Sequence, residues 1–182
     1  MTLVKALPET LCMVQATLSD LDIVVDILEE AALWMTARGI DQWQPGDFRC
    51  VRYKALCAMV EKGMVYLALW NDRPAGTITL RWLNGWDGQL WSEVGETDLQ
   101  NAGYVHSLAV RRSYAGLGHV LLRWAEEQVA AAGKGYLRLD CMADNPALCA
   151  YYERNGFTAR GVVQEKIWRA ALYEKKVSKS SL

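Results

Sequence analysis

The sequence predicts one α+β domain built on a single mixed, mostly antiparallel sheet of about seven strands flanked by four helices. The 182 residues suit one domain with one sizeable core, which we assign to residues 1–177, and the polar end at 178–182 is expected to be disordered. Strand and helix patterns follow the order β-α-α-β-β-β-α-β-α-β-β. A hairpin lies in the first half and a strand-helix-strand unit in the second, and this mixture favours the α+β class.

The first half is expected to contain a strand, two helices and the hairpin. "LCMVQAT" at 11–17 has the composition of a strand. Apolar residues at helical spacing predict helices over 20–38 and 48–62, each ended by a glycine. Two β-rich runs then flank the turn-forming residues 71–74, which indicates a hairpin. Residues 84–103 are long, Gly-rich and acidic, so we expect a functional or mobile loop there.

The second half is expected to alternate strands and helices before a final pair of strands. We predict strands at 104–110 and 136–141 and helices at 117–132 and 145–155. Asn145-Pro146 starts the second of these helices, with Asn as the N-cap and Pro in the first turn. The segments "FTARGVV" and "ALYEKKV" complete the sheet.

The composition narrows the classes of partner. A formal net charge of −1 and the lack of a long basic run argue against nucleic acid. No apolar run approaches the roughly 20 residues that span a bilayer, and the N-terminus lacks a secretory pattern, so we expect a cytoplasmic protein without a membrane partner. The five cysteines are odd in number and lack a CxxC pair. We interpret them as small core residues in a reducing compartment and predict no metal site.

A glycine turn joins a strand to a helix at Gly116-Leu117-Gly118, just after Arg111 and Arg112. A helix N-terminus presents unpaired N–H groups and partial positive charge, and glycines let a phosphate approach the backbone. The arginines can add charge-assisted contacts. The turn therefore indicates a phosphate site, the alternative being a tight connection without a ligand. It is neither a Walker loop, since no Gly-Lys-Ser/Thr follows, nor a dinucleotide GxGxxG, since Leu121 takes the third glycine position.

With this turn and the later segment "NPALCAYYERNGF", the chain resembles the GNAT superfamily of acyl-CoA-dependent N-acyltransferases. The resemblance covers most of the chain and is most specific from 104 to 157. It implies the GNAT fold, with splayed central strands, and acetyl-CoA as cosubstrate. The family's Arg/Gln-x-x-Gly-x-Gly/Ala pattern is met only at its glycines, because Ser113 or Ala115 takes the Arg/Gln position.

The resemblance also implies roles for individual residues. Leu108, Ala109 and Val110 would pair their backbone with the pantetheine arm, and Asn145 would contact the same arm. Tyr152 would lie near the thioester sulfur. The diphosphate would bind the residues around the glycine turn: Arg111, Arg112, Ser113, Ala115, Gly116, Leu117 and Gly118.

The chemistry of acetyl transfer needs a base and an acid. An alkylammonium has a pKa near that of lysine, about 10.4, so it must lose a proton before it attacks a thioester. His106 is our candidate proton acceptor, because it lies on the strand that would border the thioester and matches a relay position known in the family. Tyr152 is our candidate acid for the departing thiolate. Both could instead be core residues with satisfied polar groups.

Aromatic and acidic residues predict the acceptor side. Trp86 and Trp91 lie in the 84–103 segment and are candidates for an aromatic-walled pocket, whereas other tryptophans fit buried faces. Glu93 and Glu30 are candidates for holding a cationic amine, although such charges are usually solvated.

Three functions are weighed. The first is an N-acetyltransferase that transfers acetyl from acetyl-CoA to the primary amine of a small molecule by direct attack on the thioester. The alternatives are a non-catalytic acyl-CoA-binding module or a protein N-acetyltransferase of the same fold, and a mononucleotide binder, which the hairpin-first order disfavours. The acceptor's identity and the oligomeric state, a homodimer included, are left open.

Overall fold

The computed structural model describes residues 10–178, and its centre is a seven-stranded sheet in the order β1-β2-β3-β4-β5-β7-β6. Neighbouring strands are antiparallel except β4 and β5, which run parallel. The strands are β1 (Leu11–Gln15), β2 (Val65–Trp70), β3 (Arg73–Arg81), β4 (Ala102–Val110), β5 (Tyr136–Met142), β6 (Thr158–Gln164) and β7 (Arg169–Lys176). The predicted mixed, mostly antiparallel sheet is confirmed.

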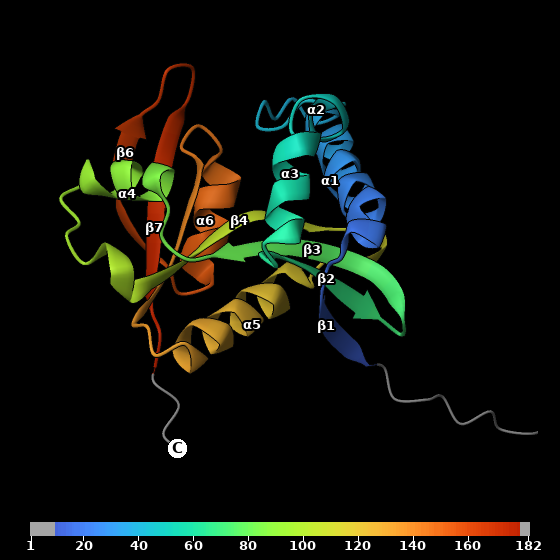
Figure 1. The fold of residues 1–182 in the computed structure, drawn as a ribbon. Helices are drawn as coiled ribbons and strands as arrows, with labels where there is room; N and C mark the ends of the chain where they lie inside the picture. Colours follow the sequence, from blue (N-terminus) through green and yellow to red (C-terminus); the bar gives the residue numbers. More distant parts are fainter. Residues whose placement is uncertain (1–9, 179–182) are drawn as a thin grey trace, which may run out of the picture.

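Helices cover both faces of the sheet (Figure 1). They are α1 (Leu21–Thr36), α2 (Asp47–Cys50), α3 (Tyr53–Glu61), α4 (Gly85–Ser92), α5 (Gly118–Ala131) and α6 (Pro146–Arg154). Six helices thus lie within residues 10–178, where the sequence predicts four. The predicted tail at 178–182 lies outside the described residues, except for Ser178.

Two differences account for the extra helices. The predicted helix over 48–62 is interrupted after Cys50 and becomes α2 and α3. The predicted loop at 84–103 contains α4, because the Asn84 side chain accepts a hydrogen bond from the Asp87 amide and so caps a helix start. A short 3₁₀ turn at Leu99–Asn101 follows in the same segment.

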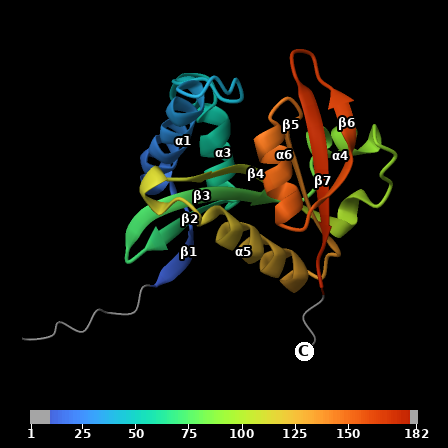
Figure 2. The same ribbon diagram turned by 180° about the vertical axis from the view of Figure 1, so that it is seen from behind.

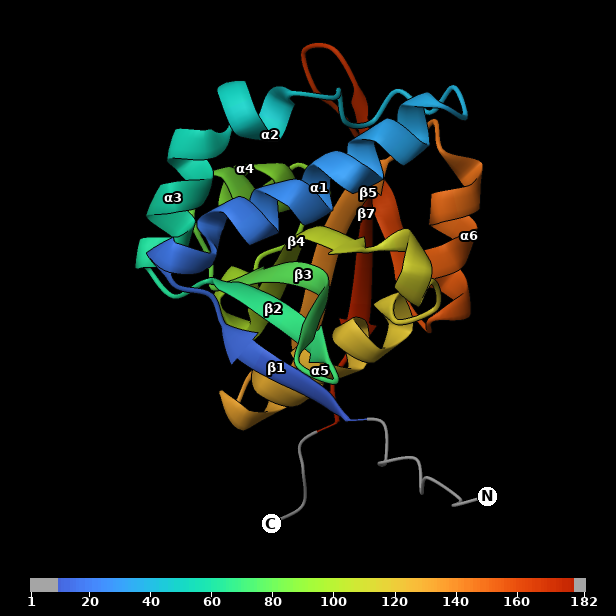
Figure 3. The ribbon, with the colours of Figure 1, turned by 90° about the vertical axis from the view of Figure 1, so that its right-hand side faces the viewer.

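Three clusters of buried side chains hold these layers together. One lies between the sheet and the pair α5 and α6, which Figure 2 shows on the same side of the molecule. A second lies under α1 and α3, which pack side by side in Figure 3 on the half of the sheet that contains β2. The third packs Leu90 and Trp91 of α4 against buried residues of β4, β6 and β7. At about 25 cal/mol per Å² of buried apolar surface, such clusters are the main source of the fold's stability.

The centre of the sheet opens between β4 and β5. Their pairing runs from Ala102 with Tyr136 to Val105 with Leu139 and goes no further among the described residues. Just beyond this point β4 carries a β-bulge, since three steps along β4 match two along β3, and Ser107 has a left-handed φ of +47°. The two strands therefore diverge at His106 and Asp140, as the expected splay requires.

Candidate active site

Two cavities meet where β4 and β5 part. The larger has a volume of about 510 Å³ and the smaller about 130 Å³. Both are lined by the same five residues, Gln42, Trp43, His106, Ser107 and Asp140. We call the larger cavity the chamber and the smaller one the slot, and these shared residues lie at their junction.

His106 lies at the junction and has a fixed orientation. Its Nε2 lies 3.0 Å from Oδ1 of Asp87, and its ring packs edge-on against Trp86, with ring centroids 5.6 Å apart. Asp87 in turn accepts hydrogen bonds of 2.9 and 3.2 Å from the Arg81 guanidinium and is almost fully buried. A carboxylate accepts only, so Nε2 carries the proton, and Nδ1 presents its lone pair in the neutral imidazole.

The protonation of Asp87 follows from its surroundings. Burial acts to raise the pKa of Asp87, but the hydrogen bonds and positive charges of His106 and Arg81 outweigh it and hold that pKa below its usual value. Asp87 therefore stays ionised near neutral pH and can stabilise a protonated His106. This pairing gives His106 what a base needs: a defined tautomer and a partner for the charge that it gains.

Asp140 lies on the other side of His106, with Oδ1 at 3.6 Å from Nδ1. Its side chain is 12% exposed. Burial raises the pKa of Asp140, and the nearby charge of His106 opposes that shift. His106 is thus held between one carboxylate that is hydrogen-bonded and one that is not.

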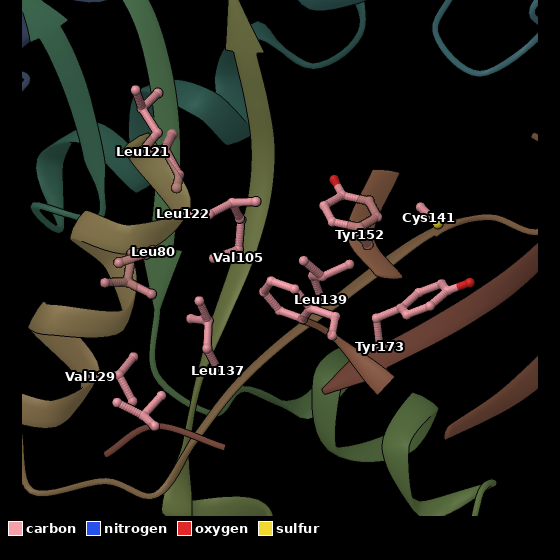
Figure 4. Packing of buried hydrophobic residues seen from close by; sticks show 14 of the residues in the cluster. Leu80, Val105, Leu121, Leu122, Val129, Leu137, Leu139, Cys141, Tyr152 and Tyr173 are labelled. Carbon is pink, nitrogen blue, oxygen red and sulfur yellow. The ribbon is translucent and has the colours of Figure 1, made fainter. Parts of the chain in front are cut away.

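Tyr152 lies at the inner end of the slot. It lines the smaller cavity together with Leu108, and its ring centroid lies 5.9 Å from those of both Phe157 and Tyr173. Figure 4 shows the Tyr152 and Tyr173 rings near each other. Burial strongly raises the pKa of Tyr152, with neighbouring ionisable groups adding to the shift. The hydroxyl therefore keeps its proton, which an acid requires.

The backbone of β4 beyond the bulge is free on one side. Ala109 pairs with Thr77 and Val110 with Gly76 of β3, whereas the opposite edge of these residues has no partner strand within 10–178. This edge borders the slot at Leu108. It offers main-chain groups to an extended ligand, the geometry expected for a pantetheine arm.

The glycine turn ends at the start of α5. Gly116 has a left-handed φ of +104°, and α5 begins at Gly118. Within the described chain, the amides of Gly116, Gly118 and His119 donate to no other protein group. A Cβ at Gly118 would lie 2.6 Å from the Tyr151 hydroxyl. The turn thus presents free N–H groups at the start of α5, and glycine at position 118 leaves access to them unobstructed.

Glu30 braces this loop instead of lining a cavity. Its carboxylate accepts from the Arg111 guanidinium at 2.7 Å and from the Arg112 amide at 2.8 Å. The rest of the loop, Ser113 to Leu117, connects the braced arginines to α5. Asn145, expected at the pantetheine arm, caps α6 by accepting from the Leu148 amide, and its Nδ2 faces Gln42 at 3.5 Å.

Of the residues predicted in the 84–103 segment to bind the acceptor, one lines a cavity and two do not. Trp86 lines the larger cavity. Trp91 is 1% exposed under the Arg138 guanidinium, because α4 turns its ring into the third cluster. Glu93 is exposed at the end of α4 and lines neither cavity. The positions of Trp91 and Glu93 differ from the prediction because α4 forms where the sequence predicts a loop.

Sequence reasoning missed Arg81, Asp87 and Asp140. The spacing of Asn84 and Asp87 fits a capped helix start, and that signal could have revealed α4. Asp140 is one step beyond Leu139, the last partner of β4 residue Val105, so it is level with His106. That relation depends on strand register, which the sequence does not specify.

Among the described residues, no helix is both long enough and apolar enough to cross a membrane. The two cavities lie where the sheet opens between β4 and β5, and His106 lies at their junction.

A family model described as the acetyltransferase (GNAT) family matches residues 25–157. An uncharacterised N-acetyltransferase of Bacillus subtilis, YesJ, is 32% identical over 149 residues, 80% of this chain and 81% of that protein. A GNAT-family acetyltransferase from Listeria monocytogenes is 26% identical, with a TM-score of 0.71 over 91% of this chain and 94% of that one. The PaiA N-acetyltransferase of Thermoplasma acidophilum, solved with coenzyme A, has a TM-score of 0.69 at 18% identity, over 92% and 99% of the chains, and shares the fold.

The chain belongs to the acetyltransferase (GNAT) family. Membership makes it an acetyl-CoA-dependent acetyltransferase, and the fold and cosubstrate that the sequence resemblance implied are confirmed.

Replacing Gly118 with valine is expected to raise the dissociation constant of coenzyme A about tenfold, because the added carbons collide with the Tyr151 hydroxyl and displace the loop amides. Calorimetric titration with coenzyme A measures the change. Adding Tyr151→Phe removes the obstructing oxygen, so the double variant should recover part of the affinity. Unchanged affinity in Gly118→Val would show that the diphosphate binds elsewhere.

Proposed function

We propose that the protein is an N-acetyltransferase that moves an acetyl group from acetyl-CoA to a primary amine of a small molecule, by direct attack on the thioester. The observation that carries this proposal is the junction of two cavities at His106, Ser107 and Asp140. The slot side suits the thioester and the chamber side suits the acceptor. Trp43, Trp86 and Trp168 line the chamber and favour an acceptor with an apolar or aromatic body.

The proposed reaction starts at Nδ1 of His106, which takes a proton from the ammonium. The neutral amine then attacks the carbonyl carbon, forming the C–N bond. Ser107 and Leu108 have no partner residue on β3, so their amides are candidate donors for the oxyanion. The C–S bond breaks, the Tyr152 hydroxyl protonates the thiolate, and the proton lost by the amide nitrogen restores that hydroxyl. His106 then releases the proton from the ammonium to water, so both side chains return to their starting states.

The shape of the chamber supports a small acceptor over a protein. Its wall combines segment 41–47, Trp86 of α4 and the β6–β7 turn residues Ile167 and Trp168. These come from three separate parts of the chain and surround the junction. A concave site of this kind fits a small molecule better than an extended peptide.

A thiol-release assay with acetyl-CoA tests the proposal. The acceptors are a panel of small primary amines and a panel of peptides with free α-amino or lysine groups. We expect turnover above the amine-free background with small amines, and an N-acetylated product by mass spectrometry. Turnover with peptides alone would favour a protein N-acetyltransferase. Binding of acetyl-CoA without any product would favour the non-catalytic module.

A further inference from the structure

Among residues 10–178, Asp140 is the one carboxylate that lines both cavities, and the mechanism proposed above gives it no role. Leu139 and Cys141, its neighbours on β5, point into the cluster under α5 and α6. Asp140 alternates with them and points to the opposite face, which β4 also presents at His106. The two side chains therefore meet at the junction because of strand alternation and register.

Within the described residues, the carboxylate of Asp140 has no hydrogen-bond donor outside its own backbone. Among residues 10–178 no other residue gives it a hydrogen bond, and the 3.6 Å to Nδ1 of His106 is too long for one. Asp87, in contrast, is bonded by both Arg81 and His106. A carboxylate that is largely removed from water and unpaired is costly, so a cationic donor placed beside it would be strongly stabilised.

The geometry points to a specific occupant, and this step rests on the proposed function. We propose that Asp140 binds the acceptor as a primary ammonium ion and sets its nitrogen against Nδ1 of His106. Two acceptor atoms 3.6 Å apart can share one ammonium, which has three N–H donors. An alcohol has a single donor and no charge, so it leaves one of the two acceptors unsatisfied.

Proton transfer follows from this placement. One N–H of the ammonium donates to Oδ1 of Asp140 and another to Nδ1 of His106. The proton on the second bond moves to Nδ1, which leaves a neutral amine with a lone pair and an imidazolium between Asp87 and Asp140. No bond to carbon changes in this step, and no further reactant is needed. Asp140 is therefore a catalytic residue that selects charged amines as acceptors.

Ligand binding to the coenzyme A complex tests the proposal, because coenzyme A carries no acetyl group and no transfer reaction can follow binding. The probes are 2-phenylethylamine and 2-phenylethanol, which differ only at the donor group and fit an aromatic-walled chamber. Calorimetry on the coenzyme A complex should give about 10- to 100-fold tighter binding of the ammonium, the range for a charged hydrogen bond. Asp140→Asn should bring the ratio of the two dissociation constants, that of 2-phenylethanol over that of 2-phenylethylamine, to near one.

Asp72→Asn is the matched control. It removes the same charge from the exposed β2–β3 turn, where φ is +62° and asparagine is well tolerated. This variant should keep the wild-type ratio. Equal or undetectable binding of the two probes by the wild type, or an unchanged ratio in Asp140→Asn, would overturn the proposal.

A melting curve shows that the variant is folded. Burial raises the pKa of Asp140, so its contribution to stability is present below its ordinary pKa and lost as pH rises through the raised value. The charged groups that face it are His106 of β4, Asp87 of α4 and Arg81 of β3. Asp140→Asn should therefore melt at or above the wild-type temperature at pH 7.

This binding experiment and the test of the proposed function can fail independently. If no amine is acetylated but the ammonium preference depends on Asp140, the reaction assignment fails and this inference stands. If amines are acetylated and the preference is absent, the inference fails alone.

Discussion

Replacing His106 with glutamine is expected to lower kcat for amine acetylation by about 10²- to 10⁴-fold, the usual effect of losing a general base. Glutamine can still donate an amide N–H to Asp87 and fill much of the space, but it has no titratable nitrogen to receive the proton. The KM for acetyl-CoA should change little, because the main-chain edge proposed for the pantetheine arm, Leu108 to Val110, lies beyond the β-bulge from His106. Steady-state kinetics at pH 7 with the best amine of the panel provide the measurement.

The pH profile of this variant is the control for its interpretation. As pH rises toward the pKa of an alkylammonium, about 10.4, more of the acceptor enters already neutral, so the variant should recover part of its deficit. A purely structural defect would not recover with pH. A kcat within about threefold of wild type at pH 7 would remove His106 from the role of base.

Replacing Tyr152 with phenylalanine is expected to lower kcat by about 10²-fold or more while acetyl-CoA binding is retained. The ring packing with Phe157 and Tyr173 is preserved, so the change removes only the hydroxyl in the slot. Because burial holds the pKa of this hydroxyl far above neutrality, it stays protonated across the working range and adds no alkaline limb to the wild-type profile.

Tyr173→Phe is the matched control for that variant. Tyr173 lies beside Tyr152, but its hydroxyl bonds Glu153 at 3.2 Å and lines neither cavity. It should lose about 1 kcal/mol of stability and keep its turnover. Similar activity in Tyr152→Phe and wild type, measured by thiol release, would mean that the thiolate leaves without help from Tyr152.

Much of the fold follows from local patterns. The succession of strands and helices along the chain, the glycine turn and the Asn145 cap are each encoded within a few neighbouring residues, so the sequence predicts them. The sequence does not predict helix α4, because glycines at 85 and 88 weaken the helical pattern and are typical of a loop. Its Asn84 cap outweighs them.

The site was harder to predict, since its partners are distant in sequence. Glu30 meets Arg111 across 81 positions, and His106 meets Asp87 across 19. No periodicity or spacing indicates such pairs, because they depend on how β4 is placed against α1 and α4. The residues expected in the slot, on β4 and α6, belong to sequence motifs and could be predicted from them. The positions of the carboxylates around His106 depend instead on the tertiary arrangement.

A crystal structure with a bisubstrate analogue tests the central claim most directly. The analogue joins the sulfur of coenzyme A through an acetyl bridge to the nitrogen of 2-phenylethylamine. We expect the bridging nitrogen within hydrogen-bond distance of Nδ1 of His106, with the diphosphate on the amides of Gly116 and Gly118. A bridge that lies outside the gap between β4 and β5, with His106 and Asp140 contacting only water, would contradict the account.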